Sequence, residues 1–578
     1  MQGGSAPGPA PSVGRETPDA RVLALADAVL ADALEAAPER AALLRIPGTR
    51  YDALPDDSVA GVAARRARRA AWLEALRAVD PVSLTEPNAA LAQALAAGRL
   101  EDAEAAAVCR AELWTVSQML NGWQVRFATL AQAQPVGSEA LRAQALARFE
   151  ALPGYVADQE ANLREGLRLG YRPWRGNVVL ALEQLEALVA LPPAESPFAS
   201  PGRRDGDPAF AARFESLVRD AIKPALARHR DFLREVVLPA ARDAPGVSAN
   251  PDGAACYRAL VRASTTLDVE PEAVHALGRE VLTGVEGEMA ALAARSFGGE
   301  PVAKLLRRLV DDPAWRFADR EAVMTQARDA IARAQAALPR AFGLLPRAPV
   351  VLEPIPAFQE RSSAPHYLVA AADGSRPATY RVRLYRPEAQ SRAPGESTAF
   401  HEVVPGHHLQ LAIAMEREGL PAIARYLGNS GFSEGWALYA ERLADELGLY
   451  SGDVDRLGML SNFAWRAVRL IVDTGMHDLG WERERAVELL TAHTALSREQ
   501  AEAEIDRYVA MPGQATSYML GYAEIRRLRA EAEAVLGPRF SLAAFHDRVL
   551  EGGGVRLPML AARVRGWVAE AGGAPGAR

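Results

Sequence analysis

Apolar residues recur at steps of three and four positions through most of residues 20–345. These segments are rich in Ala, Leu, Glu and Arg, which are strong helix formers, and Pro and Gly cluster between them. No period of about 20–50 residues repeats along the chain, which disfavours a helical-repeat solenoid. The pattern predicts a mainly α protein with a scaffold of packed helices. The predicted helices of this half span residues 21–36, 58–79, 89–130, 138–169, 176–189, 208–237, 270–294 and 319–337.

The composition changes between residues 348 and 386, where short strand-like segments are separated by Gly and Pro turns. In the last of these segments apolar and polar residues alternate, as in a half-buried strand. We expect a small antiparallel sheet just before the helix predicted at residues 398–417. Its edge strand could pair with an extended peptide substrate, or the sheet could merely cap the helical domain. The predicted strands span residues 349–353, 366–370 and 379–385.

Helices return from residue 398 onward, and six of the nine His residues and four of the nine Trp residues lie in this second half. We therefore predict a flexible leader over residues 1–19, a helical scaffold over residues 20–345, and a sheet with the site-bearing helices over residues 346–578. The last two parts are expected to form one continuous catalytic unit. The predicted helices of the second half span residues 398–417, 433–446, 455–479, 485–494, 498–509, 515–535 and 556–570.

Charge and composition exclude some classes of partner. The 66 basic and 73 acidic residues give a formal net charge of -7, so nucleic acid is not the expected partner. No window reaches the roughly 18 apolar residues that a membrane span needs. The leader lacks the regions of a signal peptide, but an exported chain trimmed of its signal would look the same, so periplasm and cytoplasm both stay open. Cys109 and Cys256 form no metal motif and no disulfide framework.

Three of the nine histidines fall in the stretch FHEVVPGHHLQ at residues 400–410. The first of them, His401, is directly followed by Glu402. This pair resembles the start of the zinc-peptidase signature HExxH, in which two histidines bind zinc and the Glu is the general base. The position four after His401 is a proline, which cannot bind a metal. The alternative is that these are unrelated surface histidines.

A regular helix does not place either later histidine where it could share an ion with His401. His407 lies about 120° off the face of His401, and His408 is back on that face but about 10.5 Å along the axis. The intervening Pro405 and Gly406 favour a bulge. A bulge that absorbs two residues would make His407 the second ligand, and one that absorbs three would make it His408. We favour His407, with His408 near the metal ligands or facing the substrate.

A third zinc ligand is expected on a neighbouring helix. Glu434, in the stretch FSEGWALYAE, begins such a helix among Gly and aromatic residues, which favours a buried functional position over a solvated acid. Glu441 lies seven residues further on the same face. From there it could hydrogen-bond to a ligand histidine.

Two further pairs of residues are candidates for the reaction itself. Gln514 and Tyr518 lie four residues apart near the start of a late helix, and a tyrosine hydroxyl there could stabilise a developing oxyanion. Asp473 and His477 are also four apart, and His477 could bind substrate or support the transition state. Ordinary packing of the tyrosine and a structural role for the histidine are the alternatives.

Five motifs in order resemble one bacterial family, catalogued as domain of unknown function 885, which is similar to zinc metallopeptidases of the gluzincin clan. They are FHEVVPGHHLQ, FSEGWALYAE, VDTGMH, YVAMPGQATSYMLG and FHDRVLEGGG, and a weaker match lies at AAPERAALLRIPGTRYDALPDDS. The resemblance implies a helical fold like that of thimet oligopeptidase or angiotensin-converting enzyme, with a deep central channel. It also implies that His401, His407 and Glu434 bind zinc, that Glu402 is the catalytic base, and that a late-helix tyrosine such as Tyr518 assists.

These observations predict a zinc-dependent hydrolase of short peptides or related amide bonds. One alternative keeps the zinc site but assigns it to an amidase or cyclase that acts on a small non-peptide substrate. A second alternative is a non-catalytic helical interaction protein with a vestigial site. The expected partner is therefore a peptide or small amide, and the oligomeric state is left open.

Overall fold

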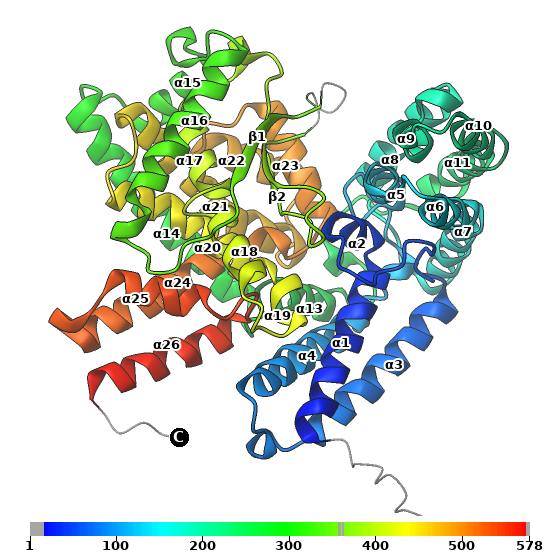
Figure 1. The fold of residues 1–578 in the computed structure, drawn as a ribbon. Coiled ribbons are helices and arrows are strands. Elements are labelled where there is room, and N and C mark those ends of the chain that lie inside the picture. The colour runs from blue at the N-terminus through cyan, green and yellow to red at the C-terminus, as the bar shows by residue number, and fades with distance from the viewer. Residues whose placement is uncertain (1–16, 357–359, 361–362, 574–578) are drawn as a thin grey trace, which may run out of the picture.

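The computed structural model describes residues 17–356, 360 and 363–573, and most of these residues lie in α-helices (Figure 1). Thr17 caps the first helix by accepting a hydrogen bond from the backbone N–H of Ala20. The helix begins at Pro18, so the leader predicted over residues 1–19 is wrong for residues 17–19, and its residues 1–16 lie outside the described residues. The helices of the first part are α1 (Pro18–Ala36), α2 (Pro38–Leu44), α3 (Val59–Arg77), α4 (Pro87–Ala106), α5 (Trp123–Ala133), α6 (Glu139–Glu150), α7 (Leu152–Leu169), α8 (Arg175–Ala190), α9 (Ser200–Asp205), α10 (Pro208–Leu217), α11 (Lys223–Phe232), α12 (Leu238–Ala240), α13 (Gly253–Thr265), α14 (Pro271–Ser296), α15 (Val302–Asp311) and α16 (Arg320–Ala337).

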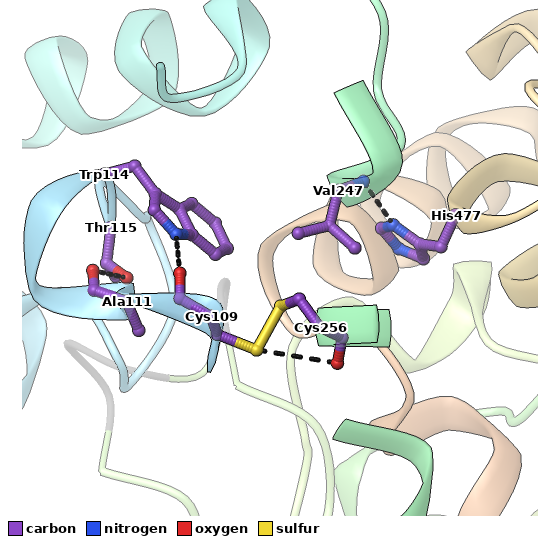
Figure 2. The surroundings of a disulfide bond; sticks show 7 residues. All are labelled: Cys109, Ala111, Trp114, Thr115, Val247, Cys256 and His477. Atoms are coloured by element: carbon purple, nitrogen blue, oxygen red, sulfur yellow. Dashed lines mark hydrogen bonds between the residues drawn. A yellow bond between two sulfur atoms is a disulfide. The ribbon is translucent and has the colours of Figure 1, made fainter. Parts of the chain in front are cut away.

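The long helix predicted over residues 89–130 is broken between α4 and α5. Arg110 adopts a left-handed conformation with φ 46°, which a continuous helix does not allow. The neighbouring Cys109 forms a disulfide with Cys256 of α13, and its carbonyl accepts a hydrogen bond from Trp114 Nε1 at 2.8 Å (Figure 2). The expectation that the two cysteines form no disulfide framework is therefore wrong, because the fold brings together residues 147 positions apart.

The small sheet has three strands in the order β1-β3-β2, formed by Val350–Pro354, Ala378–Val382 and His366–Leu368 respectively. β2 pairs with β3 in antiparallel fashion, but β1 and β3 run parallel, so the predicted all-antiparallel sheet is corrected to a mixed one. The reason is that β3 inserts between the two earlier strands. This order leaves β2 at one edge of the sheet.

The second part of the chain packs its helices around two large apolar clusters. α20 and α24 approach closely because glycines face each other. A Cβ on Gly435 would lie 2.4 Å from the backbone of Gly521, and one on Gly521 would lie 1.8 Å from the Gly431 carbonyl oxygen. The helices of this part are α17 (Gly395–Glu402), α18 (His407–Glu416), α19 (Ala422–Tyr426), α20 (Ser430–Glu446), α21 (Asp453–His477), α22 (Arg483–His493), α23 (Arg498–Ala510), α24 (Ser517–Leu536), α25 (Leu542–Leu550) and α26 (Leu557–Gly572).

The two parts of the chain are in direct contact. Gln118 and Asn121, which precede α5, donate side-chain hydrogen bonds to the backbone carbonyls of Asp506 and Ala510 in the second part. A search of the described helices finds none that is both long and apolar enough to cross a bilayer.

Candidate metal centre

The helix that carries the first histidine ends at Glu402, and a new helix begins at His407. The predicted bulge within one helix is thus replaced by a turn over residues 403–406, which contains a cis Val404–Pro405 peptide. A Cβ on Gly406 would lie 1.9 Å from the His401 carbonyl oxygen, so this turn requires glycine.

The turn brings His401 and His407 together with their ring centroids 4.9 Å apart. Trp436 of α20 supports the turn by donating a hydrogen bond from its Nε1 to the carbonyl of Pro405 at 2.9 Å. Glu434 lies on the same helix, and its Oε2 is 3.4 Å from His401 Nε2 and 3.5 Å from His407 Nε2. The three predicted zinc ligands therefore converge, with one donor atom from each within 4.8 Å of the others.

Glu441 orients the first histidine, in the position predicted for it. Its Oε1 lies 2.8 Å from His401 Nδ1, and its other oxygen accepts a hydrogen bond from Ser397. Although burial opposes the charged form, Glu434 and Glu441 raise the pKa of His401 to about 9. Burial likewise opposes ionisation of Glu434, but the two histidines hold its pKa below its usual range. The cluster thus has an electrostatic preference for positive charge.

His408 lies outside this cluster. Its Nδ1 is 3.1 Å from the hydroxyl of Tyr367, and its Nε2 is 3.0 Å from the carbonyl of Ala348, so both ring nitrogens already have partners. Burial lowers the pKa of His408, which favours the neutral ring. Of the two adjacent histidines, the structure directs His407 to the cluster and His408 to the sheet.

The edge strand β2 lies against Glu402. The backbone N–H of Tyr367 donates to Glu402 Oε2 at 2.9 Å, so this side of β2 faces the predicted catalytic base. Tyr367 is a site residue that the sequence analysis missed. No local signal could have found it, because its contacts to Glu402 and His408 depend on where the sheet packs against α17 and α18.

Tyr518 of α24 also reaches the cluster. Its ring is stacked on His401 with a centroid distance of 6.4 Å, and Arg469 lies over the Tyr518 ring at 4.3 Å. Within the described part of the chain its hydroxyl has no hydrogen-bond partner. Burial raises the pKa of Tyr518, so it stays protonated at neutral pH and is able to donate. Gln514 accepts a hydrogen bond from Arg507 and donates to Ser430, so its side chain already has protein partners.

Asp473 and His477 share α21 but do not pair with each other. His477 is fully buried; its Nδ1 accepts from the Val247 N–H at 3.0 Å (Figure 2), and its Nε2 is 3.1 Å from the Tyr508 carbonyl. Asp473 accepts from the hydroxyl of Tyr257 and from a backbone N–H. Neither nitrogen of His477 is left for a substrate, so we assign His477 a structural role.

The donor set fits a zinc ion. Two imidazoles and one carboxylate are ligands that zinc accepts in catalytic sites, where they leave one position for water. Glu441 holds the Nδ1 side of His401, which leaves Nε2 as the atom that faces Glu434, the usual arrangement of a metal-binding histidine. His407 lacks such support: its Nδ1 is buried and has no hydrogen-bond partner among the described residues.

The mainly helical fold of this chain is similar to that of proteins of known structure, of which two are described here. The "putative lipoprotein from Colwellia psychrerythraea" superimposes with a TM-score of 0.87 at 23% identity, covering 96% of this chain and 100% of that one. The "putative lipoprotein of unknown function from Shewanella oneidensis" has a TM-score of 0.74 at 20% identity, covering 93% and 99%. At these identities the likeness establishes the shared fold.

Residues 38–564 match the family model described as "Bacterial protein of unknown function (DUF885)". The chain therefore belongs to this family, which confirms the family resemblance predicted from the five motifs. A comparison with functionally curated proteins finds no match.

Proposed function

We propose that the protein is a zinc-dependent hydrolase of short peptides or related amide bonds. The observation that supports this best is that the Nε2 atoms of His401 and His407 both lie within 3.5 Å of one oxygen of Glu434. The carboxylate of Glu402 directly follows the first ligand, as the general base does in HExxH hydrolases. The motifs also resemble those of gluzincin-clan peptidases. From this resemblance we propose that the site lies in a deep central channel.

In the proposed reaction, Glu402 and Tyr518 have distinct roles beside the metal. Zinc at such a site supplies Lewis acidity, which activates water and polarises the substrate carbonyl. Glu402 takes the proton of the attacking water and passes it to the leaving nitrogen. The hydroxyl of Tyr518 donates a hydrogen bond to the developing oxyanion.

The position of β2 supports a peptide rather than a small non-peptide amide. Because the N–H of Tyr367 points to Glu402 and not to β3, the outer edge of β2 faces the proposed base. An extended peptide that adds to this edge would pass directly beside Glu402. The amidase or cyclase alternative has no comparable feature, and neither does the vestigial-site alternative.

Replacing Glu402 with Gln tests the mechanism. Removal of the base should reduce kcat by about 10²–10⁴-fold while leaving the zinc ligands intact. The measurement is hydrolysis of a panel of short peptides and acyl amino acids, with zinc content determined on the same samples. A variant that retains zinc and full activity would exclude Glu402 as the base.

We also propose that the protein works in an oxidising compartment outside the cytoplasm. The buried Cys109–Cys256 disulfide supports this, because such bonds persist mainly in exported proteins. Both structural neighbours carry the description "putative lipoprotein", which agrees with export. Thiol titration of denatured, unreduced protein from its native compartment should detect no free thiol; two free thiols per chain would contradict the proposal.

A further inference from the structure

A cavity of about 380 Å³ lies beside the first turn of α20. Its walls come from α1, α3, α4 and α13 on one side and from the residues that lead into α20 on the other. It therefore lies where the N-terminal helices meet the helix that carries Glu434.

This cavity is close to the candidate metal centre. Ser430 lines it, and Glu434 lies four residues later on the same face of α20, about 6 Å along the helix axis. A substrate bound at the centre would need only two or three extended residues to reach the cavity, at about 3.3 Å per residue.

The charged lining of the cavity is not balanced. Three arginines and two aspartates line it. Arg69 contacts Asp32 at 2.7 Å, and Arg556 is paired with Asp102. The third, Arg99, has neither a hydrogen bond nor an ion pair with any residue that the structure describes. Asp32 and Asp102 attract the Arg99 guanidinium but are already paired with the other two arginines, so the lining carries one more positive than negative side chain.

The surroundings of Arg99 disfavour its charge. Its side chain is exposed to solvent and forms part of the cavity lining. Burial, with repulsion from Arg40 and Arg69, outweighs the attraction of Asp32 and Asp102 and lowers the pKa of Arg99 to about 10. An anion in the cavity would offset both effects, and a guanidinium pairs with a carboxylate through two parallel hydrogen bonds.

We propose that this cavity binds the free carboxylate of the substrate and that Arg99 is the residue that contacts it. The substrates are then short peptides, or related amides, that carry a carboxylate a few residues from the bond to be cleaved. This inference rests on the proposed hydrolase function for identifying the anion as part of a substrate. Phosphate is the competing anion, and the experiment separates the two.

The test measures binding in the Glu402→Gln protein, so that no probe is consumed. The probes are N-acetyl-trialanine with a free C-terminus, its C-terminal amide, and inorganic phosphate, each titrated by calorimetry. The free acid should bind about 10–100-fold more tightly than the amide, the range for a hydrogen bond to a charged group. Adding Arg99→Gln should reduce this preference to about 2-fold or less, and Arg99→Lys should retain more of it than Arg99→Gln does.

Arg66→Gln is the matched control, because Arg66 is an exposed arginine on α3 that does not line the cavity. It should leave the preference unchanged. Equal binding of acid and amide, or a preference that survives Arg99→Gln, would overturn the inference. Phosphate binding that depends on Arg99, without a preference between the peptides, would overturn the assignment to a substrate carboxylate. An Arg99-dependent preference in a protein that hydrolyses neither peptide would count against the proposed hydrolase and not against this site.

Discussion

Two groups of histidine and carboxylate side chains lie in the C-terminal part of the chain, and they direct their polar atoms differently. In the candidate metal centre, the Nε2 atoms of His401 and His407 face one oxygen of Glu434. In the second group, on α21, His477 uses both ring nitrogens on backbone groups, and Asp473 accepts from Tyr257 and a backbone N–H.

The electrostatics of the two groups differ in the same way. Carboxylates overcome burial and raise the pKa of His401 to about 9, whereas burial lowers the pKa of His477 to about 3. The first group favours an added positive charge, and the second favours neutral side chains. The same residue types therefore make a candidate cation site in one place and a packed, hydrogen-bonded core in the other.

The largest expected effect separates the two adjacent histidines. His407→Ala should lower zinc affinity by more than about 100-fold, beyond the loss typical of residues that only support a ligand. His408→Ala is the matched control and should keep zinc, because its nitrogens face Tyr367 and Ala348. Competition with a chelator of known affinity measures both. Loss of zinc in the His408 variant alone would reverse the assignment.

Tyr518→Phe removes only the tyrosine hydroxyl, which has no hydrogen-bond partner among the described residues. We expect kcat to fall by about 10²–10³-fold, the usual cost of losing one oxyanion donor, with zinc content unchanged. Steady-state hydrolysis of the best peptide substrate measures this. Tyr522→Phe on the same helix serves as the control. An equal fall in both variants would show that Tyr518 acts through packing.

His477→Ala should affect stability and not zinc. It leaves the Val247 N–H and the Tyr508 carbonyl unpaired in the core, which costs about 1–3 kcal/mol for each unsatisfied group. Denaturant unfolding measures this loss. A variant of normal stability that had lost its activity would restore His477 as a catalytic candidate.

The smallest effect concerns the pH dependence of stability. Burial raises the pKa of Asp473 to about 7, from an ordinary value of 3.8, so the folded protein holds a proton that the unfolded chain releases. This contribution to stability is complete below about pH 4 and is lost as pH rises to about 7. The melting temperature of the unsubstituted protein should therefore fall as pH rises from 4 to 8. Asp473→Asn should remove the part of this slope that comes from Asp473. An unchanged slope would show that Asp473 is ionised in the fold.

Local patterns predict much of this fold and less of its site. The helix predicted at residues 270–294 is confirmed as α14, because its periodicity is a property of the segment itself. The break after α4 depends on the left-handed Arg110 and on a disulfide to a distant helix, which no local pattern contains.

Within the site, the convergence of His401 and Glu434 follows from recognisable motifs, but their surroundings do not. Spacing alone does not decide whether His407 or His408 joins His401 and Glu434. The choice depends on a turn that ends one helix and starts another. The contact of Tyr367 with Glu402 depends on β3 inserting between β1 and β2. Such features arise from tertiary packing and become visible only in the folded chain.

Elemental analysis of protein purified without a chelator measures directly whether the proposed centre holds zinc. We predict one zinc ion per chain in the unsubstituted protein and none in the His401→Ala variant, with both proteins folded by circular dichroism. Absence of stoichiometric metal from the unsubstituted protein, or full retention of metal by the variant, would contradict this prediction.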